Sequence, residues 1–140
     1  MRLWHKDLID VLPDMQLRGQ WRECCLIAKA LHEGNLNHLL VNKVKQYPIE
    51  DFVLYCNDVW YECVLRGVRA KSKRVFQYFP DIEVATIDCD CIFDGWHDTR
   101  YLRQCLYNLE EKAMCGGIPM EQWQKIVDRY GVKFDLWGGV

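Results

Sequence analysis

Apolar residues recur at helical spacing through the first part of the chain. Between residues 14 and 34 they stand four and three positions apart in alternation, at Leu17, Trp21, Cys24, Ala28 and Leu31. This spacing places them on one face of an α-helix. Asp14 is a suitable capping residue for the start of that helix, and Gly34 is a suitable end. The pattern predicts a helix from Asp14 to about Leu31.

The strongest periodicity in the chain begins at Pro48. Its apolar positions are Ile49, Phe52, Val53, Cys56, Val59, Trp60, Cys63 and Val64. Proline is favoured at the first position of a helix and glycine just after its end, which fits Pro48 and Gly67. A shorter helix is expected before it, capped by Asn37 and running from His38 to about Gln46.

The C-terminal part predicts two further helices. Asp98 opens one that ends at Gly116-Gly117, and Pro119 begins another that ends at Gly131. Their apolar positions are Leu102, Cys105, Leu106 and Leu109 in the first helix, and Trp123, Val127 and Tyr130 in the second. The aromatic tail VKFDLWGGV is expected to pack back on the body. Residues 68–97 lack a sustained period, and VFQYF within them fits either a short strand or a buried loop.

These elements predict an all-α protein, a compact single-domain helical bundle over residues 1–140 with no repeat or low-complexity tract to divide it. No stretch approaches the roughly 18 to 20 uncharged apolar residues that a membrane helix needs. The first fifteen residues carry charges where a signal peptide needs an apolar segment, at Arg2, Lys6, Asp7 and Asp10. We therefore expect a soluble, cytoplasmic protein with no membrane partner.

Eight cysteines are an unusual number for 140 residues. Most of them fall within apolar helical patterns, where cysteine behaves as a small hydrophobe. In a protein without a signal peptide, reduced thiols are therefore favoured over disulfides. The densest group, Cys89-Asp90-Cys91 near His97, lacks the CxxC pairs typical of closed zinc sites. We expect neither a metal nor a cofactor, and a cysteine-based redox or metal protein is the weakest functional hypothesis.

The net charge of −2 does not decide for or against a nucleic-acid partner, because the distribution of charge matters more than its sum. Basic residues concentrate in positions 18–22 and 66–74, whereas acidic residues crowd positions 81–98. A chain this asymmetric can present one cationic face to phosphates. For the second basic group, ordinary solvated surface is an equal alternative.

Two segments carry a resemblance to a known family. The first, MRLWHKDLIDVLPDMQLRGQWRE at residues 1–23, is similar without a gap to the opening of the phage-type pyrimidine-dimer DNA glycosylases, the phage endonuclease V family. The shared positions include Leu8, Leu12, Asp14, Leu17, Arg22 and Glu23. The second, residues 38–67, resembles the family's middle helices and ends in E-C-x-x-R-G, at Glu62, Cys63, Arg66 and Gly67. MRLWH and RECC are also typical of a bacterial and phage branch, and the resemblance covers roughly half of the chain.

The resemblance implies catalysis by Met1 and Glu23. Members of the family attack the sugar C1′ with the free α-amine of the N-terminus, release the base, and cut the strand by β-elimination from the resulting imine. An α-amine has a pKa near 8, so a useful fraction of it is neutral at physiological pH. Glu23 corresponds to the family's carboxylate, which stabilises the cationic sugar and shuttles protons. The DNA must also be bent, with a nucleotide extruded from the duplex.

The resemblance also implies a set of residues that contact double-stranded damaged DNA. Arg22 is expected to hold phosphate, since a guanidinium suits bidentate phosphate contact. The other candidates are Arg2, His5, Arg18 and Arg66. For His5 the alternative is a partly buried residue satisfied by a backbone carbonyl, and for Trp4 packing on the core is favoured over stacking on a base.

The chain departs from the family at two positions. Residue 2 is Arg2 where the family has a small threonine exposed by loss of the initiator methionine, so Met1 is expected to be retained here. Residue 3 is Leu3 where the family has an arginine that contacts substrate, and Arg2 could substitute for it. A non-catalytic protein of the same fold that binds a nucleotide or nucleic acid, such as a phage protein that sequesters a signalling nucleotide, is the alternative function. In either case, the N-terminal segment should pass against the helix that contains Glu23.

Overall fold

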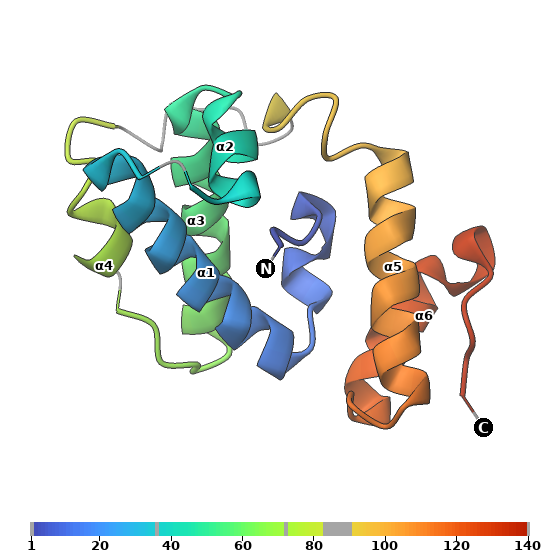
Figure 1. Ribbon diagram of the computed structural model, residues 1–140. Coiled ribbons are helices and arrows are strands. Elements are labelled where there is room, and N and C mark those ends of the chain that lie inside the picture. Colours follow the sequence, from blue (N-terminus) through green and yellow to red (C-terminus); the bar gives the residue numbers. More distant parts are fainter. Residues whose placement is uncertain (1, 36, 72, 83–90, 140) are drawn as a thin grey trace.

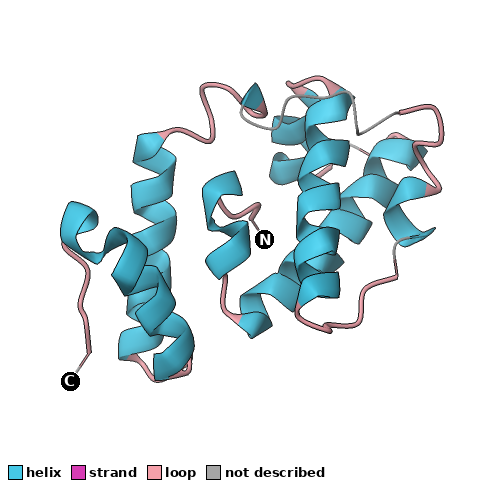
Figure 2. Cartoon of the chain, turned by 180° about the vertical axis from the view of Figure 1, so that it is seen from behind, coloured by secondary structure: helices cyan, strands magenta, loops and turns pink. Residues whose placement is uncertain are grey.

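The computed structural model describes residues 2–35, 37–71, 73–82 and 91–139 of the chain. In those residues the only regular secondary structure is helical, so the prediction of an all-α fold is confirmed. The elements are η1 (Lys6–Val11), α1 (Asp14–Glu33), α2 (Leu39–Lys45), α3 (Ile49–Leu65), α4 (Lys73–Phe76), α5 (Thr99–Met114) and α6 (Met120–Phe134). Figure 2 shows the same helical architecture from behind.

The helices form two groups with the N-terminal segment between them (Figure 1). In the first group α1 packs along α3, with α2 and α4 against α1. In the second group α5 and α6 pack on each other. The short 3₁₀-helix η1 contacts both α3 and α6 and so joins the groups. Residues 3–5 and η1 therefore lie inside the molecule, where irregular backbone is uncommon because its polar groups need partners.

The helix α1 forms as its apolar spacing predicts, and it ends at Gly34 in the left-handed conformation with φ 71°. The role expected for Asp14 is wrong. Pro13 occupies the capping position, and Asp14 is the first helical residue. Its backbone N–H donates to Gln122 Oε1 at 3.0 Å, and its carboxylate accepts from Gln122 Nε2 at 3.2 Å. Asp14 thus connects the start of α1 with α6.

The helix α3 is buried along most of its length, because it packs under α1, α2 and η1. Pro48 precedes its first residue and Gly67 follows with φ 70°, close to the predicted limits. The shorter helix α2 is confirmed, but its cap is not Asn37. The imidazole Nδ1 of His38 accepts the backbone N–H of Leu40 at 3.1 Å and caps the helix instead.

The predicted end of the last helix is wrong. α6 continues through Gly131 to Phe134, since the buried ring of Phe134 anchors its last turn. Asp135 then adopts the left-handed conformation with φ 53°, and the N–H of Leu136 bonds to the carbonyl of Gly131 at 3.0 Å. The tail packs back on the body as expected, with Trp123 Nε1 donating to the carbonyl of Trp137 at 2.8 Å.

Two elements were not predicted. η1 occupies residues that show no helical period, and its first turn is held by the imidazole of His5, which accepts the backbone N–H of Asp7 at 3.0 Å. α4 covers the beginning of VFQYF, where Val75 is fully buried, so this part forms neither the short strand nor the buried loop that were the two alternatives. The candidate metal residues Cys89 and Asp90 lie outside the described residues. No helix among the described residues is long and apolar enough to cross a bilayer.

Candidate active site at the N-terminus

The segment from Arg2 to His5 has no regular secondary structure and yet is buried. Leu3 is 0 % exposed, Trp4 7 % and His5 2 %. The prediction that Trp4 packs on the core is confirmed. Arg2 is half-buried, and its guanidinium carbon lies 5.0 Å from the centroid of the Trp4 ring. The core position of Leu3 leaves Arg2 as the basic side chain of this segment that remains partly exposed.

Gln20 of α1 binds the backbone of this segment on both sides of Leu3. Its side-chain oxygen accepts the N–H of Trp4 at 2.6 Å, and its amide nitrogen donates to the carbonyl of Arg2 at 3.0 Å. Gln20 is itself 1 % exposed, so these bonds lie in the core. The prediction that the N-terminal segment passes against the helix containing Glu23 is therefore confirmed.

Two tyrosines complete the contacts of the same backbone. The hydroxyl of Tyr55, on α3, lies 2.6 Å from the carbonyl of Trp4 and 3.0 Å from Gln20 Oε1. The hydroxyl of Tyr101, on α5, donates to the carbonyl of Leu3 at 2.6 Å. Burial raises the pKa of both hydroxyls above the usual value, so both remain protonated donors.

Glu23 follows Gln20 by three residues on α1, a spacing that places their side chains on neighbouring positions of one helix face. Its carboxylate atom Oε2 is buried and has no hydrogen-bond partner among the described residues. A buried carboxylate oxygen without a partner is destabilising, and a bound ligand or a catalytic role is one explanation for such a group. Met1, which would carry the amine, lies outside the described residues.

The ring of His5, the last residue of the segment, stacks on that of His97, with ring centroids 5.2 Å apart. Each accepts a backbone N–H through Nδ1: His5 from Asp7, and His97 from Lys6 at 2.9 Å. Burial lowers the pKa of His97 to about 2, and His5 and Lys6 add to this effect. Burial also lowers the pKa of His5, although the Asp7 carboxylate opposes the shift. Both imidazoles are therefore neutral hydrogen-bond acceptors, and the DNA contact expected of His5 has no support in this geometry.

The exposed side of α1 is basic. Arg18, Arg22 and Lys29 are exposed and share a stripe with the half-buried Cys25 at spacings of four, three and four. Burial raises the pKa of the Cys25 thiol to about 11, the neighbouring Cys24 adds to this effect, and the guanidinium of Arg74 opposes it. The helix α4 packs against α1, and its exposed Arg74 adds a further positive charge to this part of the surface. We call Arg18, Arg22, Lys29 and Arg74 the α1–α4 cationic surface.

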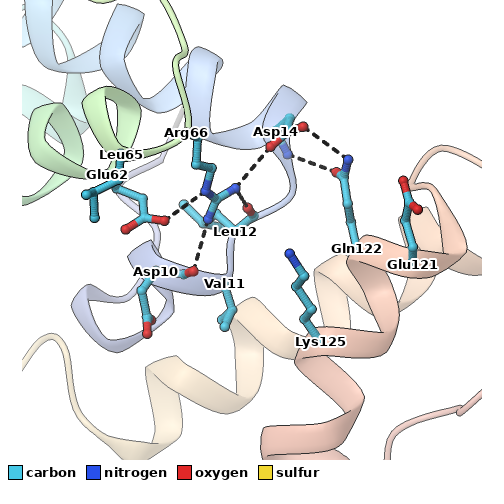
Figure 3. A pocket seen from close by; sticks show the side chains of 10 residues that line it. All are labelled: Asp10, Val11, Leu12, Asp14, Glu62, Leu65, Arg66, Glu121, Gln122 and Lys125. Carbon is cyan, nitrogen blue, oxygen red and sulfur yellow. Dashed lines mark hydrogen bonds and ion pairs between the residues drawn. The ribbon is translucent and has the colours of Figure 1, made fainter.

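Arg66 lies elsewhere, in a pocket of about 580 Å³ at the other end of α1 (Figure 3). Its Nε donates to Glu62 at 2.8 Å and its Nη1 to Asp14 at 3.1 Å. Further bonds run from its guanidinium to the carbonyls of Leu12 and Asp10. Arg66 thus pins the η1–α1 junction to the end of α3. About 14 Å of helix axis separates Asp14, which Arg66 binds, from Glu23. Arg66 is therefore not brought together with Glu23.

The described cysteines are all free thiols, and three of them, Cys24, Cys56 and Cys63, are fully buried between α1 and α3. They serve as core residues, as their place in the apolar patterns predicts. Among the described residues, no group of three or more histidine, cysteine or acidic side chains is arranged to hold a metal ion.

Sequence reasoning missed Gln20, Tyr55 and Tyr101. A signal for Gln20 was present, because it stands three residues after Leu17 and four before Cys24, on the apolar face of α1. A polar side chain at such a position needs a buried partner. Tyr55 has the same kind of signal within the buried pattern of α3. Nothing local in the sequence indicates that the partner of all three residues is the N-terminal backbone.

Comparison with protein families matches residues 1–75 to the pyrimidine dimer DNA glycosylases. The matched region includes the N-terminal segment, α1 with Gln20 and Glu23, and Tyr55 of α3, whereas Tyr101 lies beyond it. No curated protein and no solved structure matches the chain. Because the match covers more than half of the 140 residues, the chain belongs to the pyrimidine dimer DNA glycosylase family.

Proposed function

We propose that this protein is a DNA glycosylase with abasic-site lyase activity on damaged pyrimidines in double-stranded DNA. One observation carries the proposal. The backbone next to the N-terminal residue is bonded to Gln20, and one helical turn further on Glu23 has a buried carboxylate oxygen without a partner in the described chain. The family supplies the general activity, and this arrangement supports the retention of its chemistry.

The proposed nucleophile is the α-amine of Met1. In its neutral form the amine nitrogen attacks C1′ of the damaged nucleotide, the bond from C1′ to the base breaks, and the base departs with that electron pair and gains a proton. Ring opening and loss of the amine's remaining protons give an imine between the protein and the sugar. Removal of a proton from C2′ then expels the phosphate on C3′ and cuts the strand.

Glu23 is suited to the charges that develop in this sequence. Its carboxylate can stabilise the cationic sugar as the base leaves, and it can accept and return the protons that the amine and C2′ release. A partly buried carboxylate exerts a stronger electrostatic effect than one in water, because the surrounding dielectric constant is lower.

The α1–α4 cationic surface is the proposed contact with the DNA backbone. Arg18 and Arg22 are exposed and one helical turn apart, and Arg22 adjoins Glu23 in the chain. Their guanidinium groups suit bidentate contact with phosphates. Arg2, which is half-buried beside Trp4, is the proposed contact nearest to the nucleophile. His5 and Arg66 have their polar groups engaged inside the protein, so we assign them no DNA contact.

Borohydride trapping with a duplex that contains one abasic site tests the proposal. The expected result is a covalent adduct between protein and DNA, located at the N-terminal peptide by mass spectrometry and abolished by prior acetylation of the α-amine. An adduct formed through a lysine instead would contradict the proposed nucleophile. Binding of the duplex without any adduct or cleavage would overturn the proposal and favour the non-catalytic binder of the same fold.

A further inference from the structure

The backbone of residues 2–4 is held by side chains from three different helices. Gln20 of α1 bonds to Arg2 and Trp4, Tyr55 of α3 to Trp4, and Tyr101 of α5 to Leu3. Three successive carbonyls and one N–H are thus bonded to polar side chains that are buried (Gln20 and Tyr55) or partly buried (Tyr101). We call Gln20, Tyr55 and Tyr101 the N-terminal clamp.

Burial of an irregular segment does not by itself require so many polar contacts. Apolar side chains such as Leu3 already anchor the segment in the core, and an end of a chain ordinarily lies at the surface, where water satisfies its backbone. Here two large polar side chains, Gln20 and Tyr55, are buried instead, and that of Tyr101 is partly buried. A buried polar side chain is destabilising without its partner. The contacts come from three directions, so they fix the position of the segment and not merely its depth.

We propose that the N-terminal clamp positions the α-amine for attack, and that Tyr101, contributed by α5 from outside the region that matches the family, is one of its positioning residues. The catalytic consequence rests on the proposed function. Met1 is joined by a single peptide bond to Arg2, whose carbonyl is held 3.0 Å from Gln20. A nucleophile must lie within roughly 3–3.5 Å of the atom that it attacks, and a misplacement of about 1 Å can cost about 100-fold in rate. Fixing Arg2 and Leu3 restricts where the amine can reach relative to Glu23.

Replacement of Tyr101 by phenylalanine removes one hydroxyl and leaves the ring in place. The matched control is Tyr107→Phe, because Tyr107 also lies on α5 and its hydroxyl also donates to a backbone carbonyl, that of Phe134 at 3.2 Å, away from the N-terminus. The measurement is the single-turnover rate of adduct formation at saturating abasic duplex, at a temperature where circular dichroism shows each variant to be folded. The Kd for the duplex is measured in parallel.

We expect Tyr101→Phe to slow adduct formation about 10- to 100-fold with a Kd within about twofold of the wild type, since the cationic surface is untouched. Tyr55→Phe should behave similarly, and Tyr107→Phe should leave the rate unchanged. If Tyr101→Phe lowers the melting temperature but leaves the rate of the folded protein unchanged, the hydroxyl is merely structural and the inference is wrong.

A second measurement does not depend on activity. The pKa of the α-amine is obtained from its rate of acetylation as a function of pH, followed by mass spectrometry of the N-terminal peptide. The clamp predicts that the pKa of the α-amine shifts in Tyr101→Phe by more than about 0.5 unit, which is the usual spread of N-terminal pKa values among folded proteins. It predicts no shift of this pKa in Tyr107→Phe. If the pKa of the α-amine is the same in both variants as in the wild type, the proposed clamp is wrong, even if the wild type forms no adduct. If the pKa shifts in Tyr101→Phe but no adduct forms, only the proposed function is contradicted.

Discussion

Glu23 leaves one carboxylate oxygen buried on α1 without a partner among the described residues, and this makes its substitution informative. In Glu23→Gln the volume is kept but the negative charge is lost. We expect base release and adduct formation to fall about 100- to 1,000-fold, as is typical when one electrostatic group of an active site is removed. Binding of the abasic duplex should be nearly unchanged, because the phosphate contacts remain. Glu33→Gln, at the exposed end of the same helix, is the control and should alter neither quantity.

Arg22 adjoins Glu23 but is exposed, so its substitution should have a different effect. Arg22→Ala removes one phosphate contact, weakens binding of the duplex, and reduces the slope of log K against log salt by about one ion. The measurement is a salt titration of the dissociation constant. Arg100→Ala, which removes an exposed charge from the start of α5, should leave the slope unchanged. Equal effects of the two substitutions would show that only the total charge matters and would remove Arg22 from the interface.

The residues of the candidate site differ in how far the sequence could reveal them. Glu23 and Arg22 were found through the family resemblance, since a glutamate in mid-helix is by itself unremarkable. Gln20 could have been found from its place on an apolar helix face. Tyr101 could not, because its partner is a backbone carbonyl 98 positions away in the chain, and periodicity carries no information about such contacts.

At the scale of elements, Arg66 shows why a matched motif does not assign a role. The resemblance places it among the DNA contacts, but the structure engages its guanidinium with Glu62, Asp14 and backbone carbonyls at the junction of η1 and α1. Its side chain is 22 % exposed, whereas that of Arg129, which pairs with Asp10 on the same junction, is 43 % exposed. The interactions of Arg66 are therefore less screened by water.

We expect Arg66→Ala to lower the free energy of unfolding by about 2 kcal/mol, because it leaves two carboxylates and several carbonyls without their charged donor. Arg129→Ala should cost less than about 1 kcal/mol, as is usual for an exposed ion pair. Urea denaturation followed by circular dichroism measures both. The Kd of Arg66→Ala for the duplex should equal that of the wild type. A weaker Kd with unchanged stability would instead restore Arg66 to the DNA interface.

The long helices could be predicted from the sequence, and the short elements could not. α1, α3 and α5 each present a repeated apolar face, and their ends carry glycine or a capping aspartate where the geometry needs them. η1 and α4 are too short to show a period, and they exist because the surrounding helices bury them. The end of α6 was misplaced because a glycine inside a helix is tolerated when a buried residue such as Phe134 anchors the next turn.

At the scale of the whole molecule, the small net charge conceals a separation of charge. The α1–α4 cationic surface lies on one side of the first group of helices. At the junction of η1, α3 and α6, acidic side chains outnumber basic ones around the pockets. The acidic residues are Asp7, Asp10, Asp14, Asp58, Glu62 and Glu121, and the basic ones are Lys6, Arg66, Lys125 and Arg129. A polyanion approaching the cationic surface therefore meets positive potential although the chain is slightly negative overall.

We also propose that residues 1–140 form a single domain, which the continuous hydrophobic core from Leu3 to Leu136 supports.

The two buried histidines predict how the stability of this domain depends on pH. His5 and His97 have lowered pKa values in the folded protein, so below the unfolded pKa of about 6.5 the unfolded chain binds protons that the folded chain does not. The contribution of the two histidines to the free energy of unfolding is fully present above that pH. It is lost as the pH falls towards their pKa values in the folded protein. Between pH 7.5 and 5.5, His97 alone should cost about 1.4 kcal/mol of unfolding free energy, and His5 adds to this loss.

The substitution His97→Asn tests this assignment, because the amide oxygen of asparagine can accept the N–H of Lys6 in place of Nδ1 but takes up no proton. The control is His38→Asn, in which an exposed histidine that also accepts a backbone N–H is replaced by a good capping residue. Urea denaturation at pH 7.5 and 5.5 should show a smaller loss of stability for His97→Asn than for the wild type, and an unchanged loss for His38→Asn. If the wild type is equally stable at both pH values, its buried imidazoles accept protons in the folded protein as readily as in the unfolded one. The assignment of His5 and His97 as neutral acceptors would then be wrong.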